Sequence, residues 1–254
     1  MCGGDQELSK VAAISIYRCL IYGFAPCIQH KLKGLKSVCK PFIRNYQYNV
    51  IKNQADSVVR AYQSINDSKI LESVRFTAQS KVLELFPDVM DERKALLESV
   101  EALTLTNDVQ KYLQELEPYL IEFPQITESQ IRKLFKKNKK LKLPDLAQID
   151  FRFISYLSWI DISTNKMFLV YDAGGQFVGI EGRYTETNKK SYCFACNRYE
   201  KLVLFSAISK KRPEHASQDY YRSVGNYICI NGHDCNRNIT NVSSLETFIA
   251  SVLG

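Results

Sequence analysis

Four cysteines in the last quarter of the chain form two close pairs, Cys193/Cys196 and Cys229/Cys235. The first pair has the C-x2-C spacing of a metal-binding knuckle, and 32 residues separate it from the second pair. Four thiolates complete a tetrahedron around a zinc ion at about 2.3 Å and leave no coordination position for a substrate. The pattern therefore predicts one structural zinc ion, whose binding free energy contributes to the folding of this half of the chain.

Two other interpretations of these cysteines stay open at this point. A C-x2-C pair also occurs in redox proteins, usually where a strand runs into a helix, but the sequence after Cys196 is strand-forming again. His233 could replace Cys235 as the fourth ligand, because an imidazole nitrogen is also a common zinc ligand. We expect a reducing, cytoplasmic environment, in which paired cysteines bind metal more often than they form disulfides.

Composition and charge exclude several classes of protein. The 254 residues are 45% hydrophobic and 24% charged, which is typical of a globular chain. The longest apolar stretch, residues 11–28, contains Arg18 and Pro26, so we predict neither a membrane span nor a secretory signal. The net charge of +7 is uneven, because residues 131–142 contain seven basic residues and no acidic one. Such a block predicts a domain junction or a contact surface for anions.

The first half of the chain has the pattern of a helical domain. Residues 1–40 lack a clean hydrophobic stripe, and we predict an extension outside the fold, the alternative being a short docking helix at Val11–Tyr22. From Asn45 to Phe123 apolar residues recur at spacings of three and four, and Asp67 is placed to cap the second helix. We therefore predict a four-helix bundle over residues 41–124. Its stripes are Ile51, Ala55, Val58 and Tyr62; Leu71, Val74, Ala78, Val82 and Leu85; Leu96, Val100 and Leu103; and Val109, Tyr112, Leu113, Leu116 and Leu120.

The second half changes from helical to strand-like spacing. Thr127 and Gln130 form a capping box, which predicts a helix that continues through the basic block until Pro144 ends it. We predict an α+β domain over residues 125–254 that contains the zinc finger, and hence a two-domain α+β protein. A strand is expected at 151–160, followed by a hairpin in which strands at 167–171 and 177–180 are joined by a Gly174-Gly175 turn. Further strands are expected near 190–192, 202–206 and 226–228. A final helix is expected at 244–253.

These motifs in this order resemble a known family. The segments Tyr192-Cys193-x2-Cys196 and Tyr227-Ile228-Cys229-x5-Cys235, followed by a C-terminal helix, resemble the treble-clef finger of FusB-type elongation factor G-binding proteins, which are fusidic acid resistance factors. The resemblance covers roughly residues 41–254, through Trp159 and the 134–144 segment back to Tyr46-Gln47-Tyr48-Asn49. It implies a cytoplasmic, monomeric, non-enzymatic protein that binds elongation factor G and promotes its release from ribosomes stalled by fusidic acid.

The resemblance also implies a set of partner-facing residues around the finger. By position these are Tyr192, Tyr227 and Phe248, and Arg222 lies where the family leads us to expect a lysine. Aromatic side chains suit an interface because they bury a large area at a low cost in conformational entropy. Tyr192 and Phe248 could equally pack around the small zinc core, and Phe248 shares a helical stripe with Leu245, which favours a core position.

Two other classes of function compete with this interpretation. The three histidines form no recognisable catalytic arrangement and the chain contains no phosphate-binding glycine loop, so we predict neither an enzyme nor a small-molecule substrate. The alternative is a zinc-finger protein that binds ribosomal RNA directly through the basic block at 132–142. In that case RNA phosphates, or an acidic protein surface, would contact Lys136, Lys137, Lys139 and Lys140.

Overall fold

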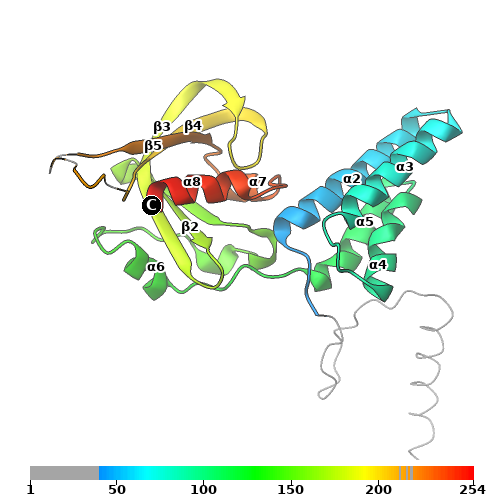
Figure 1. Cartoon of the computed structure of the whole chain (residues 1–254), viewed down its shortest axis with the longest axis horizontal. Coiled ribbons are helices and arrows are strands. Elements are labelled where there is room, and N and C mark those ends of the chain that lie inside the picture. Colours follow the sequence, from blue (N-terminus) through cyan, green and yellow to red (C-terminus); the bar gives the residue numbers. More distant parts are fainter. Residues whose placement is uncertain (1–39, 212, 216, 218–219) are drawn as a thin grey trace, which may run out of the picture. The chain divides into compact units, whose positions relative to one another are not determined.

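The computed structural model describes residues 40–254 except 212, 216 and 218–219 (Figure 1). The predicted extension lies outside the described residues apart from Lys40. By its internal contacts the chain divides into two compact units. Residues Gln54–Tyr119 belong to the first unit, and residues Phe42–Asn53 together with Leu120–Gly254 form the second. No helix in the described part of the chain has the length and apolar character that a membrane crossing requires.

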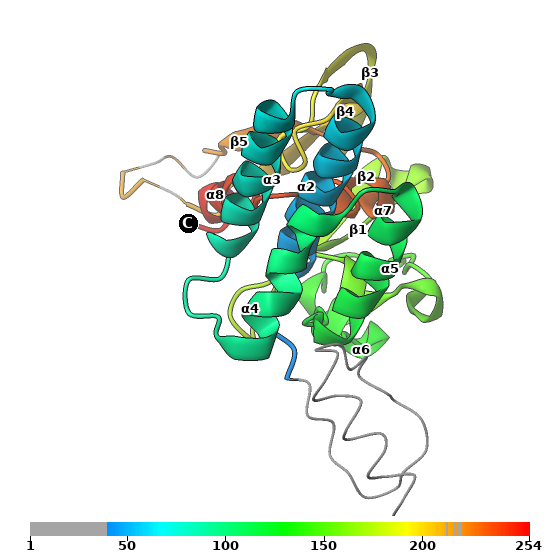
Figure 2. The ribbon, with the colours of Figure 1, turned by 90° about the vertical axis from the view of Figure 1, so that its right-hand side faces the viewer.

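The first unit is helical, as the spacing of its apolar residues predicts (Figure 2). It contains the C-terminal part of α2 (Asn45–Ser64), then α3 (Ser68–Leu83), α4 (Asp91–Glu98) and α5 (Thr106–Leu116). Asp67 caps α3, since its carboxylate accepts hydrogen bonds from the backbone N–H groups of Lys69 and Ile70. Two short 3-10 helices, Ser99–Ala102 and Glu117–Tyr119, extend α4 and α5, the second of them containing Pro118.

Helix α2 contributes to both units by its contacts. The buried side chains of Asn45 and Asn49 donate hydrogen bonds to the backbone oxygen of Asn236 in the second unit, at 2.9 and 2.8 Å. Leu120 forms a parallel β-bridge with Ile43, so this residue also belongs to the second unit. Buried amides need such partners, and these bonds assign the first turns of α2 to the zinc-finger unit.

The second unit is built on a five-stranded antiparallel sheet with the strands in sequence order. The strands are β1 (Leu157–Asp161), β2 (Lys166–Asp172), β3 (Phe177–Tyr192), β4 (Tyr199–Ile208) and β5 (Ser223–Ile228). The predicted β2–β3 hairpin is confirmed: Gly174 and Gly175 take φ values of +71° and +93°, which glycine adopts without strain. Strand β3 joins the segments 177–180 and 190–192, which were predicted as separate strands, and its pairing with β4 shifts register between Glu186 and Lys190.

Helices cover the two faces of the sheet unequally. On one face α8 (Ser243–Leu253) packs against the sheet, with the ring of Phe248 5.7 Å from that of Phe205. On the other face the segment after α6 (Glu128–Leu134) packs over the first strands, where the ring of Phe135 lies 5.0 Å from Phe168 and 5.8 Å from Trp159. Both faces of the β1–β2 region are therefore buried in hydrophobic clusters.

The predicted helix through the basic block is wrong. The capping box of Thr127 and Gln130 forms as expected, but α6 ends at Leu134. The next residues form turns, held by a hydrogen bond from the backbone N–H of Asn138 to the oxygen of Phe135 at 2.9 Å. The Asn138 side chain bonds to Glu181 and accepts a hydrogen bond from Lys166 at 2.7 Å. These contacts to the sheet bend the chain away from the helix.

The segment before β1 also differs from the predicted strand at 151–160. Its first residues, Phe151–Phe153, form a 3-10 helix, and the strand begins only at Leu157. Asp150 caps this turn through the backbone N–H of Arg152 and forms an ion pair with the same arginine at 2.7 Å. Arg152 holds the pKa of the Asp150 carboxyl below its usual value. Two further 3-10 turns lie at Leu146–Gln148 and Ile162–Thr164.

Candidate zinc finger and its surface

The four predicted cysteines come together at one end of the sheet. Their sulfur atoms all lie within 4.8 Å of one another. The Sγ atoms of Cys193 and Cys235 are 3.7 Å apart, and those of Cys196 and Cys229 are 3.6 Å apart. In a regular tetrahedron with bonds of about 2.3 Å the edge is about 3.8 Å long. The spacing of the sulfurs therefore fits a single four-coordinate zinc ion.

Three short backbone elements position the ligands. Cys193 follows β3, and a tight turn with Asn197 in the left-handed conformation (φ 56°) brings Cys196 back toward the same point. In this turn the backbone N–H of Asn197 donates to the oxygen of Cys193 at 2.8 Å. Cys229 follows β5, and Cys235 lies in α7 (Gly232–Asn236). The knuckle after β3 thus supplies two ligands, Cys193 and Cys196. The other two, Cys229 and Cys235, come from the end of β5 and from α7.

The structure also decides between the open interpretations of the second pair. The side chain of His233 is 68% exposed and lies 3.7 Å from Asp234. Among the described residues the cluster of metal-binding side chains consists of the four cysteines. Because Cys235 is fully buried within this cluster, it provides the fourth sulfur and His233 does not.

The electrostatics of the cluster favour a bound cation. The pKa of the Cys193 thiol lies far below its usual value because Cys196, Cys229 and Cys235 direct their thiol hydrogens toward it. The pKa values of Cys229 and Cys235 are raised in turn, chiefly by their hydrogen bonds to Cys193. The Cys193 thiolate therefore suppresses ionisation of Cys229 and Cys235, although the pKa of Cys196 is lowered. A divalent cation at the centre would hold all four as thiolates.

A buried tyrosine hydroxyl gives independent support for this site. Tyr156 is fully buried, and its hydroxyl has no hydrogen-bond partner in the part of the chain that is described. Burial raises its pKa far above the usual value, and the neighbouring thiol of Cys235 raises it further. An unpaired buried hydroxyl is costly, but a zinc-bound thiolate at Cys235 would accept its hydrogen bond. The residues present thus fit the metal, and Tyr156 would orient one of its ligands.

The polar residue that fixes the ligand helix was not predicted from the sequence. Asn236, 2% exposed, accepts hydrogen bonds from the backbone N–H groups of Ser155 and Tyr156, and its amide donates to the oxygens of Tyr156 and Gly232 at 2.8 Å. Its own backbone oxygen accepts the bonds from α2 described above. Asn45 and Asn49 lie one helical turn apart, and this spacing indicates a polar contact on one side of α2. Nothing in the sequence indicates which residue is their partner.

The predicted partner-facing residues occupy different environments. Tyr192 is 62% exposed and Tyr227 43%, whereas Phe248 is buried between the rings of Phe194 and Phe205. Phe248 is thus a core residue, which agrees with its position on the apolar stripe of the helix. Arg222 is exposed just before β5. The lysines 136, 137, 139 and 140 are all exposed in the turns after α6.

Two exposed apolar residues that the sequence did not single out lie beside the predicted tyrosines. Tyr199, 56% exposed, packs against Tyr192 with the rings tilted by 53° and their centroids 5.1 Å apart. Ile230, 39% exposed, follows Cys229. A pocket of about 470 Å³ lies beside the zinc ligands and is lined by Cys196, Cys229 and Ile230 together with charged residues of both signs. Each cysteine knuckle is therefore flanked by exposed apolar side chains.

Comparison with known proteins now identifies the family. Residues 42–124 match the model of the N-terminal domain of elongation factor G-binding proteins, and residues 125–249 match the FBP C-terminal treble-clef zinc finger. The chain belongs to the elongation factor G-binding protein family. A solved structure, that of the fusidic acid resistance protein FusC, matches with a TM-score of 0.69 and 28% sequence identity, covering 83% of this chain and 97% of that chain. No match was found among curated proteins.

Membership of the elongation factor G-binding family confirms three predictions from the sequence. The resemblance to this family is correct, the fold is α+β with helices followed by an antiparallel sheet domain, and the four clustered cysteines belong to a treble-clef zinc finger. The zinc ion is structural, because all four ligands come from the chain. It ties the end of β3, the end of β5 and α7 to one point.

Proposed function

We propose that this protein binds elongation factor G through the surface of its zinc finger and promotes release of the factor from ribosomes stalled by fusidic acid. The main support for this docking surface is a set of exposed apolar residues beside the zinc ligands. These are Tyr192, Tyr199, Tyr227 and Ile230. Tyr192 and Tyr199 are in ring contact, and exposed apolar side chains beside a rigid site are typical of protein interaction surfaces. The protein then acts as a monomer in the cytoplasm, by binding and without catalysis.

The zinc site gives this surface its rigidity. Tyr192 immediately precedes Cys193, and Tyr227 lies two residues before Cys229, so the metal fixes the backbone that carries both rings. The backbone N–H of Phe194 also donates to the oxygen of Tyr227 at 2.9 Å, which joins the two segments directly. Anchors that are held in place before binding lose little conformational entropy when a partner arrives.

Release of a trapped factor follows from differential affinity. A binding protein shifts the equilibrium between two conformations only if it prefers one of them. This protein must therefore bind the departing conformation of elongation factor G more tightly than the stalled one. A preference of about 1.4 kcal/mol changes the ratio of the two states tenfold.

The binding step is tested by calorimetric titration of the full zinc-loaded chain with elongation factor G. Tyr227→Ala should weaken binding about tenfold or more, as expected for an aromatic anchor. The matched control is Tyr62→Ala, because Tyr62 is 46% exposed and lies in the helical unit. Equal loss in both variants would contradict docking through the finger, and no binding by the unaltered protein would contradict the function itself.

The release step needs a separate measurement. Ribosomes carrying elongation factor G, GDP and fusidic acid are sedimented with and without the protein, and the factor is quantified in the supernatant. We expect the released fraction to rise with the protein and to stay at its basal level with Tyr227→Ala. Binding without any rise in the released fraction would show that the protein associates with the factor but does not release it.

A further inference from the structure

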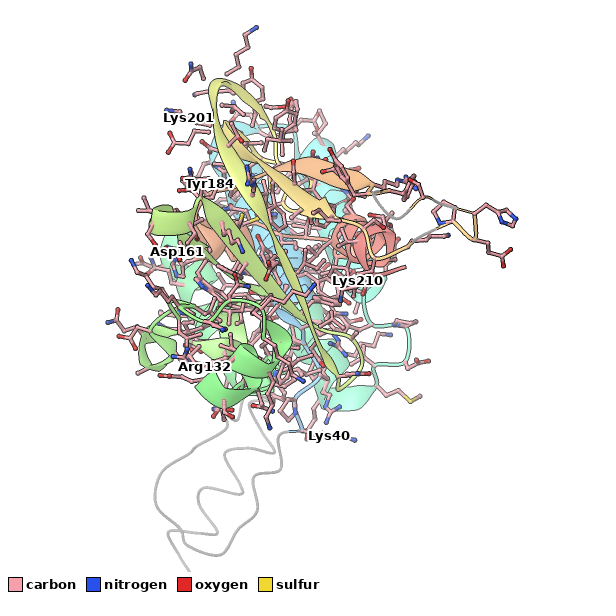
Figure 3. The ribbon with its side chains drawn as sticks, turned by 90° about the vertical axis from the view of Figure 1, so that its left-hand side faces the viewer. Lys40, Arg132, Asp161, Tyr184, Lys201 and Lys210 are labelled. Carbon is pink, nitrogen blue, oxygen red and sulfur yellow. The ribbon has the colours of Figure 1, made fainter. Side chains whose placement is uncertain are left out.

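A groove of about 800 Å³ lies on the sheet, away from the zinc ligands. It exists because α6 and the following turn cover only part of this face of the sheet. Side chains alternate along a strand, so the pairing of Arg183 with Ser206 and of Ser206 with Gly225 places these residues on one face. This part of the face stays open beside Phe135, and Figure 3 shows this side of the unit with Lys210 labelled.

The groove is strongly basic. Lys133, Lys136 and Lys137 line it from α6 and the turn after it, Arg183 lines it from β3, and Lys210 lines it from the segment after β4. None of these five side chains forms an ion pair with any residue that the structure describes. The groove also contains Glu181, but this carboxylate is paired with Lys166 at 3.2 Å and bonded to Asn138. The net field in the groove is therefore positive, which favours a ligand that carries negative charges.

Neutral groups in the groove narrow the choice of ligand. The hydroxyl-bearing residues Ser206 and Ser223 line it, and hydroxyl groups commonly contact phosphate oxygens, whereas the Ser209 hydroxyl already donates to the backbone oxygen of Ser251 at 2.9 Å. Apolar side chains, among them Phe135, Ile208 and Val252, complete the lining. Tyr221, also in the lining, is 73% exposed and presents an aromatic ring to solvent. A cationic groove combined with an exposed aromatic ring is the arrangement by which proteins bind single-stranded nucleic acid. A peptide made only of acidic residues would pair with the cations but would leave the tyrosine ring without a stacking partner.

We propose that this groove binds single-stranded RNA, with phosphates along its lysines and one base stacked on Tyr221. Only part of the basic block takes part, because Lys136 and Lys137 line the groove whereas Lys139 and Lys140 do not. The site is independent of the docking surface proposed above, since no zinc ligand lines it. The protein therefore has two separate contact surfaces, one for a protein and one for RNA.

The chain itself supplies a matched pair of variants for the test. Lys136→Ala/Lys137→Ala and Lys139→Ala/Lys140→Ala remove the same charge from exposed positions of the same segment. The probe is a fluorescein-labelled oligouridine of about twelve nucleotides, and its anisotropy is measured with the full zinc-loaded chain at several salt concentrations. Each lost phosphate contact on a single strand lowers the salt slope by about 0.7. The first variant should therefore lose about 1.4 from the slope and bind about 25-fold more weakly at 0.1 M salt, and the second should lose little.

Stacking is tested with a second matched pair. Tyr221→Ala should weaken binding about tenfold without changing the salt slope, because a ring carries no charge. Tyr220→Ala is the control, since Tyr220 is exposed but does not line the groove. Equal losses in the two lysine variants, no binding of oligouridine by the unaltered chain, or displacement of oligouridine by polyglutamate at equal charge would each overturn the proposal. Loss of oligouridine binding that leaves elongation factor G binding intact supports two separate surfaces.

Discussion

The hydrogen bonds of Asn49 allow a quantitative prediction of stability. Asn49 is 5% exposed, and its amide donates to the backbone oxygens of Asn236 and Ile239, both at 2.8 Å. Each such bond contributes about 1 kcal/mol, so Asn49→Ala loses about 2 kcal/mol. Alanine returns about 0.5 kcal/mol through its higher helix propensity. We therefore expect the free energy of unfolding of the second unit to fall by about 1.5 kcal/mol.

The same helix provides the control for this substitution. Asn53 lies one turn after Asn49, is exposed, and forms no hydrogen bond through its side chain with the described residues. Asn53→Ala gains the same helix propensity without losing a buried bond. The difference between the two variants then isolates the buried hydrogen bonds, and it should be about 2 kcal/mol in favour of Asn53→Ala.

The assay uses the only tryptophan of the chain as its reporter. Trp159 lies in the second unit together with Asn49, so its fluorescence during urea unfolding follows this unit rather than the helical one. With an m-value of about 2 kcal/mol per molar urea, the midpoints of the zinc-loaded variants should differ by about 1 M. Midpoints that agree within about 0.3 M would refute the reasoning, because the bonds to Asn236 and Ile239 would then contribute nothing measurable.

Three further predictions concern the metal and the sheet. Cys235→Ser should abolish binding of zinc, whereas His233→Ala should retain one ion per chain, as measured by elemental analysis of protein freed of excess metal. Tyr156→Phe should weaken zinc affinity about tenfold in competition with a chromogenic chelator, because a ligand thiolate loses its supporting hydrogen bond; unchanged affinity would show that the hydroxyl does not reach the thiolate. Gly182→Ala should destabilise the sheet by about 1–3 kcal/mol in the Trp159 assay, since a Cβ at this position would lie 2.4 Å from the backbone oxygen of Ser206.

Local features of the fold follow from the sequence because they depend on neighbouring residues. Asp67 caps its helix, the capping box at Thr127 forms, and the glycines at 174–175 close the hairpin as expected. The spacing of the cysteines was sufficient to predict the metal, since few other arrangements use four thiols at such positions. The caps and the turn depend on residues that are close in sequence. The cysteines are far apart, but the coordination chemistry of zinc specifies them as ligands.

The errors concern segments whose structure depends on distant partners. The basic residues after Leu134 have good helix propensity, but Phe135 is drawn into the core beside Phe168 and Asn138 bonds to Glu181 of β3. Tertiary contacts of this kind outweigh propensities of a few tenths of a kcal/mol per residue. In the same way, nothing near Asn45 reveals that its partner lies about 190 residues further along the chain.

The sequence by itself therefore determined the two-part α+β organisation, the zinc ligands and the resemblance to the elongation factor G-binding family. Only the tertiary structure decided which exposed residues share a surface: Tyr199 packs against Tyr192, Phe248 is buried, and Lys136 rather than Lys139 lines the basic groove. The physical reason is that ligand chemistry and local hydrogen bonding depend only on the types of the residues and on their spacing in the sequence. Burial and surface neighbourhood depend instead on the register of strands and on which helix covers which face of the sheet.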